Sequence, residues 1–237
     1  MEKMTDSELK QVLGDDYYAP EGLYQRTKDM PFLGSVSCSI EEMEAGSWQE
    51  IVIDYQLGQS GMADGSWFKA TFRFYSDWEL FQTTDPSAAN YVSAEYHAGE
   101  TVRGQSPASV QKLSVRFDQK GHERPFQKAI IVDTYDGYLK AGDHIVIRMG
   151  DRRFGGPGTR VQTFTERDFR FRCYVDPLGT SRFAAVAPDL VIDIKPGAPA
   201  LLQWAGSRIV RQGEKLPLRV RAEDQWGNTC WDRAETV

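Results

Sequence analysis

The sequence has 237 residues, of which 41% are hydrophobic and 26% charged, and its formal net charge is −6. A chain of this length can bury a large core without disulfides or a structural metal. The negative balance argues against nucleic acid as the main ligand, and no run of about 18 apolar residues exists to form a membrane-spanning helix. The N-terminus lacks the basic start and apolar run of a signal peptide, so we expect a cytoplasmic protein with no membrane partner.

Residues 1–44 are predicted to form a short helix followed by an extended arm. The spacing of residues 5–8 matches a capping box, and apolar residues after them recur at helical intervals, which predicts a helix over residues 6–13. Prolines, glycines and aromatic residues then alternate without a regular period. We therefore expect this segment to wrap around the domain that follows.

Residues 45–187 are predicted to form a large antiparallel β-sandwich. In the run Phe68, Ala70, Phe72 and Phe74 every second residue is apolar, which indicates a strand with one face on a core. The same alternation predicts strands over residues 48–57, 67–75, 90–96, 112–117, 127–135, 143–149 and 168–175. No helical pattern separates consecutive strands, so the sequence predicts an all-β fold rather than a parallel α/β sheet.

Residues 188–237 are predicted to form part of a second, immunoglobulin-like β-sandwich. Alternating segments at 190–194, 200–204 and 216–224 are separated by proline- and glycine-containing breaks. An immunoglobulin-like sandwich has about seven strands in about 100 residues. We therefore expect this segment to be incomplete.

Three stretches of sequence carry a resemblance to a known family. They are Gly46-Ser47-Trp48; the string Trp78, Phe81-Gln82, Asp85-Pro86, Asn90-Tyr91-Val92; and the string Gly197-Ala198-Pro199, Gly213-Glu214, Ala222-Glu223-Asp224-Gln225-Trp226-Gly227-Asn228. Over residues 45–230 the chain resembles the N-terminal half of a large, mostly uncharacterised bacterial family. In that family a β-sandwich and an immunoglobulin-like segment precede a C-terminal domain resembling PHP-type metal-dependent hydrolases. The resemblance implies that a divalent metal belongs to that C-terminal domain, whose His-x-His motif has no counterpart here.

The three histidines do not have the spacing of a local metal site. His97, His122 and His144 are too far apart for an i, i+2 or i, i+4 pair, although a sheet could bring them together. His122 lies in a turn-like stretch and is predicted to be exposed. Cys38, Cys173 and Cys230 are an odd number at wide spacings and are interpreted as free thiols. We expect no cofactor and no metal in this chain.

An enzymatic alternative depends on carboxylates. The chain has no Gly-x-Ser-x-Gly motif, but acids on or beside predicted strands could flank a groove and act as acid and base. The candidates are Asp54, Asp77, Glu79, Asp133 and Asp136, with His97 or His144 as a further proton-transfer group. The competing interpretation is that these are the outward acids of any β protein.

Two sets of residues are candidates for ligand binding. Trp67, Trp78 and Tyr91 could present flat rings to a sugar, as in a carbohydrate-binding module, unless they pack in the core. The second set lies in the glycine-rich loop over residues 151–163 and consists of Arg152, Arg153 and Arg160. Their guanidinium groups could bind an anion through bidentate hydrogen bonds. The competing interpretation is that these arginines offset nearby acids.

The absence of a catalytic motif and the apparently incomplete second sandwich lead to one functional hypothesis. We expect a non-catalytic β-sandwich region of a larger, metal-dependent hydrolase-like protein, which shapes substrate access or subunit contact. Its expected partner is a C-terminal catalytic-like domain or a companion chain, with a homo-oligomer as a further form. A self-contained β-sandwich hydrolase or lyase, and a carbohydrate-binding module, are the alternatives.

Overall fold

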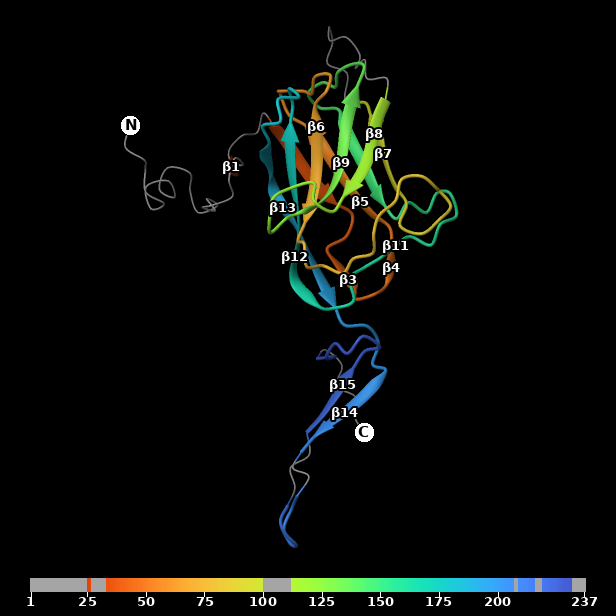
Figure 1. Cartoon of the computed structure of the whole chain (residues 1–237), viewed down its shortest axis with the longest axis vertical. Coiled ribbons are helices and arrows are strands. Elements are labelled where there is room, and N and C mark those ends of the chain that lie inside the picture. Colours follow the sequence, from red (N-terminus) through yellow and green to blue (C-terminus); the bar gives the residue numbers. More distant parts are fainter. Residues whose placement is uncertain (1–24, 27–32, 100–111, 207–208, 216–218, 232–237) are drawn as a thin grey trace, which may run out of the picture.

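The computed structural model describes residues 25–26, 33–99, 112–206, 209–215 and 219–231 (Figure 1). These residues form an all-β structure with the strands β1 (Gln25–Arg26), β2 (Gly34–Cys38), β3 (Glu42–Glu44), β4 (Trp48–Gln49), β5 (Ile51–Leu57), β6 (Trp67–Phe72), β7 (Val92–His97), β8 (Lys112–Asp118), β9 (Lys128–Tyr135), β10 (His144–Met149), β11 (Thr159–Arg160), β12 (Glu166–Asp176), β13 (Ala184–Lys195), β14 (Leu201–Ala205) and β15 (Arg219–Glu223). No helix among them is long and apolar enough to cross a membrane.

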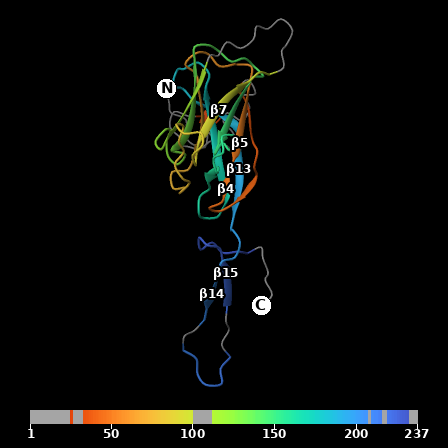
Figure 2. The same cartoon turned by 90° about the vertical axis from the view of Figure 1, so that its right-hand side faces the viewer.

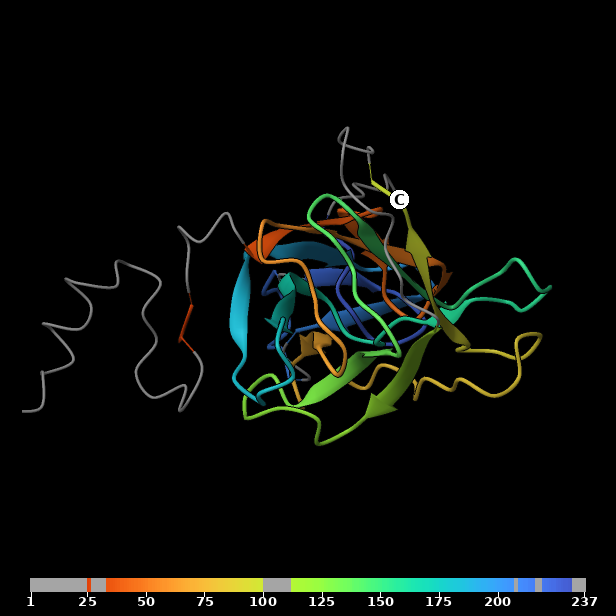
Figure 3. The same cartoon turned by 90° about the horizontal axis from the view of Figure 1, so that it is seen from above.

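Two main sheets form a sandwich-like body. The large sheet has the order β1-β13-β12-β6-β9-β8, with β3 also paired to β13. The small sheet has the order β2-β5-β10-β7, and its strands are all antiparallel. The elongated shape, with a hairpin extending from one end, is seen in Figure 2, and Figure 3 looks down on the two layers. The predicted all-β, sandwich-like fold is thus confirmed.

Alternation along the strands builds the core between the two sheets. Phe68, Ala70 and Phe72 of β6 point inward and are at most 1% exposed. The ring of Tyr55 from the small sheet stacks on that of Phe68 from the large sheet, with ring centroids 4.7 Å apart. Around Phe72, further rings from several strands and loops lie within 5.6–6.3 Å: Trp78, Phe81, Phe117, Phe169 and Phe171. The contact between Tyr55 and Phe68 joins the two layers, and the cluster around Phe72 joins strands of the large sheet to the loop after β6.

The sandwich is longer in sequence than residues 45–187. β2 lies at an edge of the small sheet, and β1 and β3 pair in parallel with β13, so the predicted arm contributes strands to both sheets. β13 continues to Lys195, so the predicted boundary at residue 188 falls inside a strand. The described sandwich therefore consists of the short strand β1 and the continuous segment from Leu33 to Lys195. The helix predicted over residues 6–13 lies outside the described residues.

After β13 the chain forms a separate hairpin, β14–β15. Its two strands are antiparallel, with Leu202 opposite Ala222 and Trp204 opposite Val220. The hairpin pairs with neither main sheet. Among the described residues, the second unit predicted for 188–237 is this hairpin and the turn that follows it.

A joint of specific contacts connects the hairpin to the sandwich. Gly46 has a φ of +67°, and a Cβ there would lie 2.1 Å from Nε1 of Trp226, so only glycine leaves room for the indole ring. The side chain of Asn228 donates to the carbonyl of Thr163 at 2.8 Å and accepts from the amide of Thr165 at 3.1 Å. The turn that follows β15 is therefore fastened to the sandwich at two points, through Trp226 and Asn228.

Candidate functional site on the outer face of the small sheet

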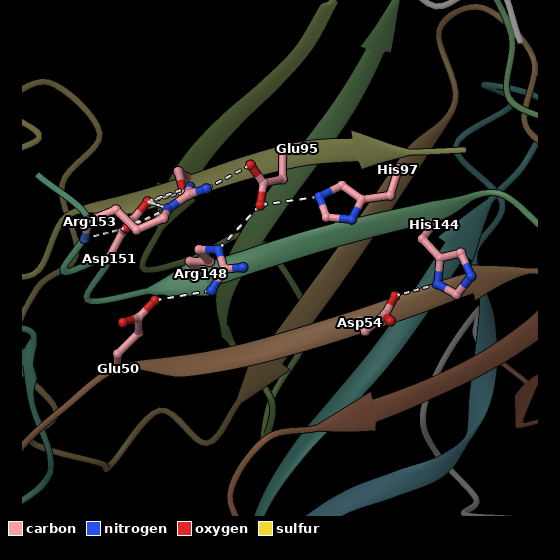
Figure 4. Close-up of polar contacts among 9 residues, drawn as sticks. Glu50, Asp54, Glu95, His97, His144, Arg148, Asp151 and Arg153 are labelled. Carbon is pink, nitrogen blue, oxygen red and sulfur yellow. Dashed lines mark hydrogen bonds and ion pairs between the residues drawn. The ribbon is translucent and has the colours of Figure 1, made fainter. Parts of the chain in front are cut away.

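The densest group of interacting polar side chains lies on the outer face of the small sheet (Figure 4). In β10 the apolar residues Ile145 and Ile147 point into the core, so His144 and Arg148, on either side of them in the chain, point outward. The same alternation in β5 and β7 places acids and a histidine beside them. We call this set the polar face; its members are Glu50, Asp54, Glu95, His97, His144, Arg148, Asp151 and Arg153.

Glu95 is the centre of the network. Its Oε1 accepts from Nε of Arg148 at 3.2 Å and lies 3.3 Å from Nε2 of His97. Its Oε2 accepts from Nη1 of Arg153 at 2.8 Å. Partial burial acts to raise the pKa of Glu95, but the hydrogen bonds from the two arginines outweigh it and the net pKa is lowered. Glu95 therefore stays ionised and links three cationic or cationisable groups.

Asp151 anchors one end of the polar face. Its carboxylate is fully buried, accepts from Ser93 Oγ at 2.7 Å and pairs with Nη2 of Arg153 at 2.8 Å. Burial opposes ionisation, yet these hydrogen bonds dominate and hold the pKa of Asp151 at about 2. The same pairing raises the pKa of Arg153. Both charges are thus fixed in place over the physiological pH range.

Two histidines meet at the other end. His97 of β7 and His144 of β10 are direct cross-strand partners, although 47 positions separate them in the chain. Nδ1 of His144 lies 2.8 Å from Oδ1 of Asp54, and Nε2 of His97 faces Glu95. Each imidazole is therefore oriented by its own carboxylate (Figure 4).

His122 is not part of this group, and the prediction that it is exposed is wrong. Its ring packs against Tyr174 of β12, with centroids 4.2 Å apart, at the outer face of the large sheet. Burial first, and then the positive charges of Lys69 and Arg172, lower its pKa to about 3. His122 is therefore a neutral packing residue at ordinary pH.

The aromatic residues predicted to bind a sugar do not form one exposed surface. Trp78 is only 2% exposed and its Nε1 donates to Oγ1 of Thr159 at 2.9 Å, so its use as a surface platform is ruled out and the core interpretation is correct. Trp67 is half-buried beside Phe183 on the outer face of the large sheet. Tyr91 is half-buried beside Phe154. The three rings therefore serve different parts of the fold.

The three arginines of the 151–163 loop are each engaged separately. Arg153 pairs with Asp151 and Glu95, and Nε of Arg160 pairs with Glu79 at 3.1 Å. Arg152 donates to the backbone carbonyls of Pro157 and Trp48. For Arg153 and Arg160 the geometry follows the competing interpretation, in which the arginines offset acids, whereas Arg152 contacts backbone carbonyls.

The predicted catalytic carboxylates are scattered over the molecule. Asp133 pairs with Arg116 at 3.2 Å on the outer face of the large sheet, whereas His144 lies on the outer face of the small sheet. Asp77 accepts from Thr163, and Glu79 pairs with Arg160. Of the proposed acids, Asp54 alone contacts one of the histidines within the described part of the chain.

Sequence reasoning missed half of the members of the polar face, namely Glu50, Glu95, Arg148 and Asp151. Glu95 and His97 are two positions apart in one strand and therefore lie on the same face, which the sequence alone could have predicted. The contacts of Glu95 with Arg148 and of His144 with His97 depend on the register between β7 and β10, for which no local pattern exists. Among the described residues, no group of three or more His, Cys, Asp and Glu side chains is arranged to hold a metal ion.

The fold defines the class: an all-β, sandwich-like protein with a C-terminal hairpin. No family model matches the sequence, and no curated protein matches it. One similar solved structure is described as "AvmM Catalyzes Macrocyclization in Alchivemycin A Biosynthesis"; it is 11% identical, covers 70% of this chain and 92% of its own, and has a TM-score of 0.30. A likeness this weak carries no argument about activity.

Proposed function

We propose that this chain is a non-catalytic β-sandwich module that docks through its β14–β15 hairpin onto a C-terminal, metal-dependent hydrolase-like domain or onto a companion chain. In that role it shapes substrate access or subunit contact. The resemblance of three sequence stretches to the N-terminal half of such proteins supports the proposal. The observation that carries it is the exposed apolar face of the hairpin.

The hairpin has one apolar and one polar face. Alternation and the cross-strand register place Leu202, Trp204, Val220 and Ala222 together on one side. Leu202, Trp204 and Val220 are 58%, 61% and 60% exposed, so most of the surface of these side chains is open to solvent. A two-stranded hairpin is marginally stable by itself, and an exposed apolar surface of this kind marks an interaction site. A second layer of strands on this face would complete an immunoglobulin-like sandwich.

The first test is to read the native gene downstream of codon 237 and to express any encoded domain as a separate polypeptide. Isothermal titration calorimetry then measures its binding to the present chain. Leu202→Ser is expected to weaken binding by at least about tenfold, because it places a hydroxyl at the centre of an apolar contact. Leu201→Ser is the matched control, since Leu201 is adjacent, equally apolar and exposed, and lies on the opposite face.

Two outcomes contradict the proposal. An in-frame stop codon directly after codon 237 would exclude a C-terminal domain in the same chain. Equal effects of the two serine variants on binding would exclude the apolar face as the docking surface. Sedimentation velocity of the chain alone separates the companion-chain form from self-association. A dimer that Leu202→Ser dissociates and Leu201→Ser preserves assigns the hairpin to subunit contact.

A second candidate function is a self-contained hydrolase or lyase. One observation favours it: Asp54 holds Nδ1 of His144, which leaves Nε2 available to take a proton. Activity of the purified chain on a panel of glycosides, esters and phosphoesters, lost in both Asp54→Asn and His144→Gln, would support this candidate. Silence across the panel would leave the docking function as the better account.

A further inference from the structure

His97 and His144 are placed where two imidazoles can share one ligand. They are opposite one another on neighbouring antiparallel strands and point to the same outer face. Directly opposed side chains in such a pair have Cβ atoms about 5 Å apart. At this separation one nitrogen of each ring can reach a common ligand atom.

Each ring has one nitrogen occupied by a carboxylate and one that is available. Asp54 holds Nδ1 of His144 and Glu95 faces Nε2 of His97. No described residue hydrogen-bonds Nε2 of His144 or Nδ1 of His97. Metal-binding histidines have this arrangement, in which one nitrogen ligates the metal and the other donates to a carboxylate that fixes the ring and increases its basicity.

The charge and the exposure of the polar face also suit a cation. Glu50, Glu95 and Asp151 pair with the guanidinium groups of Arg148 and Arg153, and Asp54 pairs with His144. Four acids and two guanidinium groups leave a net charge of −2 when both histidines are neutral. The side chains of His97 and His144 are 52% and 28% exposed, so an ion reaches them from solvent. A divalent ion would neutralise the excess charge.

We propose that His97 and His144 bind one divalent transition-metal ion of the kind that prefers imidazole, namely Zn²⁺, Ni²⁺ or Cu²⁺. The protein supplies two ligands, and water or a bound molecule completes the coordination. Asp54 and Glu95 act as positioning residues behind the two rings. This site lies on the sandwich, contrary to the expectation that the chain holds no metal, and it is independent of the proposed docking through the hairpin.

The test is calorimetric titration of the tag-free chain, stripped with a chelator, with Zn²⁺ and Ni²⁺. The wild-type chain is expected to bind one ion per chain at sub-millimolar concentration. His97→Gln and His144→Gln should each weaken binding more than about tenfold, and Asp54→Asn by about tenfold, the range seen for groups behind the ligands. Both histidines are on the surface, so these variants should keep the far-ultraviolet circular dichroism of the wild type.

His122→Gln is the matched control, because it removes a histidine at the large sheet and should leave the affinity unchanged. Mg²⁺ and Ca²⁺ form the second control, since hard cations prefer oxygen ligands and should not compete. The proposal is overturned by an affinity that the His97 and His144 variants do not change. It is equally overturned by Mg²⁺ binding as well as Zn²⁺, which would mean that the carboxylates alone attract cations.

Discussion

The outer faces of the two sheets carry similar charged residues in opposite environments. On the large sheet, Lys69 is 5% exposed and Arg172 is 3% exposed. On the small sheet, the side chains of Glu95 and Arg153 are 30% and 41% exposed, respectively. The difference arises because loops cover the first face and leave the second open. Lys69 and Arg172 on the outer face of the large sheet therefore pack inside the protein, whereas Glu95 and Arg153 on the small sheet are accessible to solvent.

The cover over the large sheet consists of residues from two loops. Lys69 donates to the carbonyl of Gly121 at 3.0 Å and lies 3.8 Å from the ring centroid of Phe183. The guanidinium of Arg172 lies 4.2 Å from the ring centroid of Phe126. Burial first, and the charge of Arg116 next, lower the pKa of Lys69 to about 8. The charged form of Lys69 on this face is disfavoured, whereas Asp151 on the open face is stabilised in its charged form.

The largest effect that separates the two faces is expected at Asp189. Its carboxylate is 4% exposed and accepts from two nitrogens of Arg172, each at 3.4 Å, and from Nη1 of Arg170 at 3.3 Å. Asp189→Ala removes the carboxylate that compensates the charge of the buried Arg172 guanidinium. The substitution should therefore lower the free energy of unfolding by about 3–5 kcal/mol. Urea denaturation measures the change. Asp168→Ala is the control, because Asp168 also pairs with Arg170 but is 51% exposed, and it should cost less than about 1 kcal/mol. Similar losses in both variants would contradict the distinction.

Lys69 should give an intermediate effect that depends on pH. Its folded-state pKa of about 8 lies below the unfolded value of about 10.4, so the unfolded chain binds the extra proton between these pH values. The free energy of unfolding should therefore rise with pH across this window, by roughly 1–3 kcal/mol. Lys69→Met removes this contribution. The measurement is the difference between wild-type and variant stability at pH 7.5, 9 and 10.5, and a constant difference would show that Lys69 titrates normally.

The smallest effect is expected on the open face. Glu50 pairs with Nη1 of Arg148 at 3.2 Å, and both side chains are 24% exposed. Because Arg148 keeps its contact with Glu95, Glu50→Gln should cost less than about 1 kcal/mol. The cost should shrink further as salt screens the pair. Denaturation at low and high sodium chloride checks this, and a loss above about 2 kcal/mol would mean that the open face also supports the fold.

The sequence predicted the strands of the sandwich wherever large apolar residues alternate. β5 and β6 were found in this way, because Ile51, Ile53 and Tyr55, or Phe68 and Phe72, mark the inward face. β2 and β3 were missed, because Val36 and Met43 are their only inward apolar residues that are fully buried. Strands at the edge of a sheet bury little and so leave a weak pattern.

The candidate site was predicted only in part. His144 and Asp54 were named as candidates, but nothing in the sequence joined them, and His97 was not joined to His144. Their proximity depends on β10 lying between β5 and β7 in one register. The strands β6, β8 and β9 lie between them in sequence but belong to the other sheet. No local spacing in the sequence therefore predicts that residues of β5, β7 and β10 lie side by side. His122 was wrongly predicted to be exposed, because the ring of Tyr174 beneath it comes from a distant strand.

The joint at Gly46 has a consequence for whatever the hairpin binds. The indole of Trp226 fills the space that a side chain at position 46 would need, and Asn228 ties the adjoining turn to Thr163 and Thr165. These contacts fix the orientation of the hairpin relative to the sandwich, unlike a connection through a flexible linker alone. A molecule bound to Leu202 and Trp204 would therefore have a defined orientation relative to the sandwich, so the chain would determine how its partner is oriented.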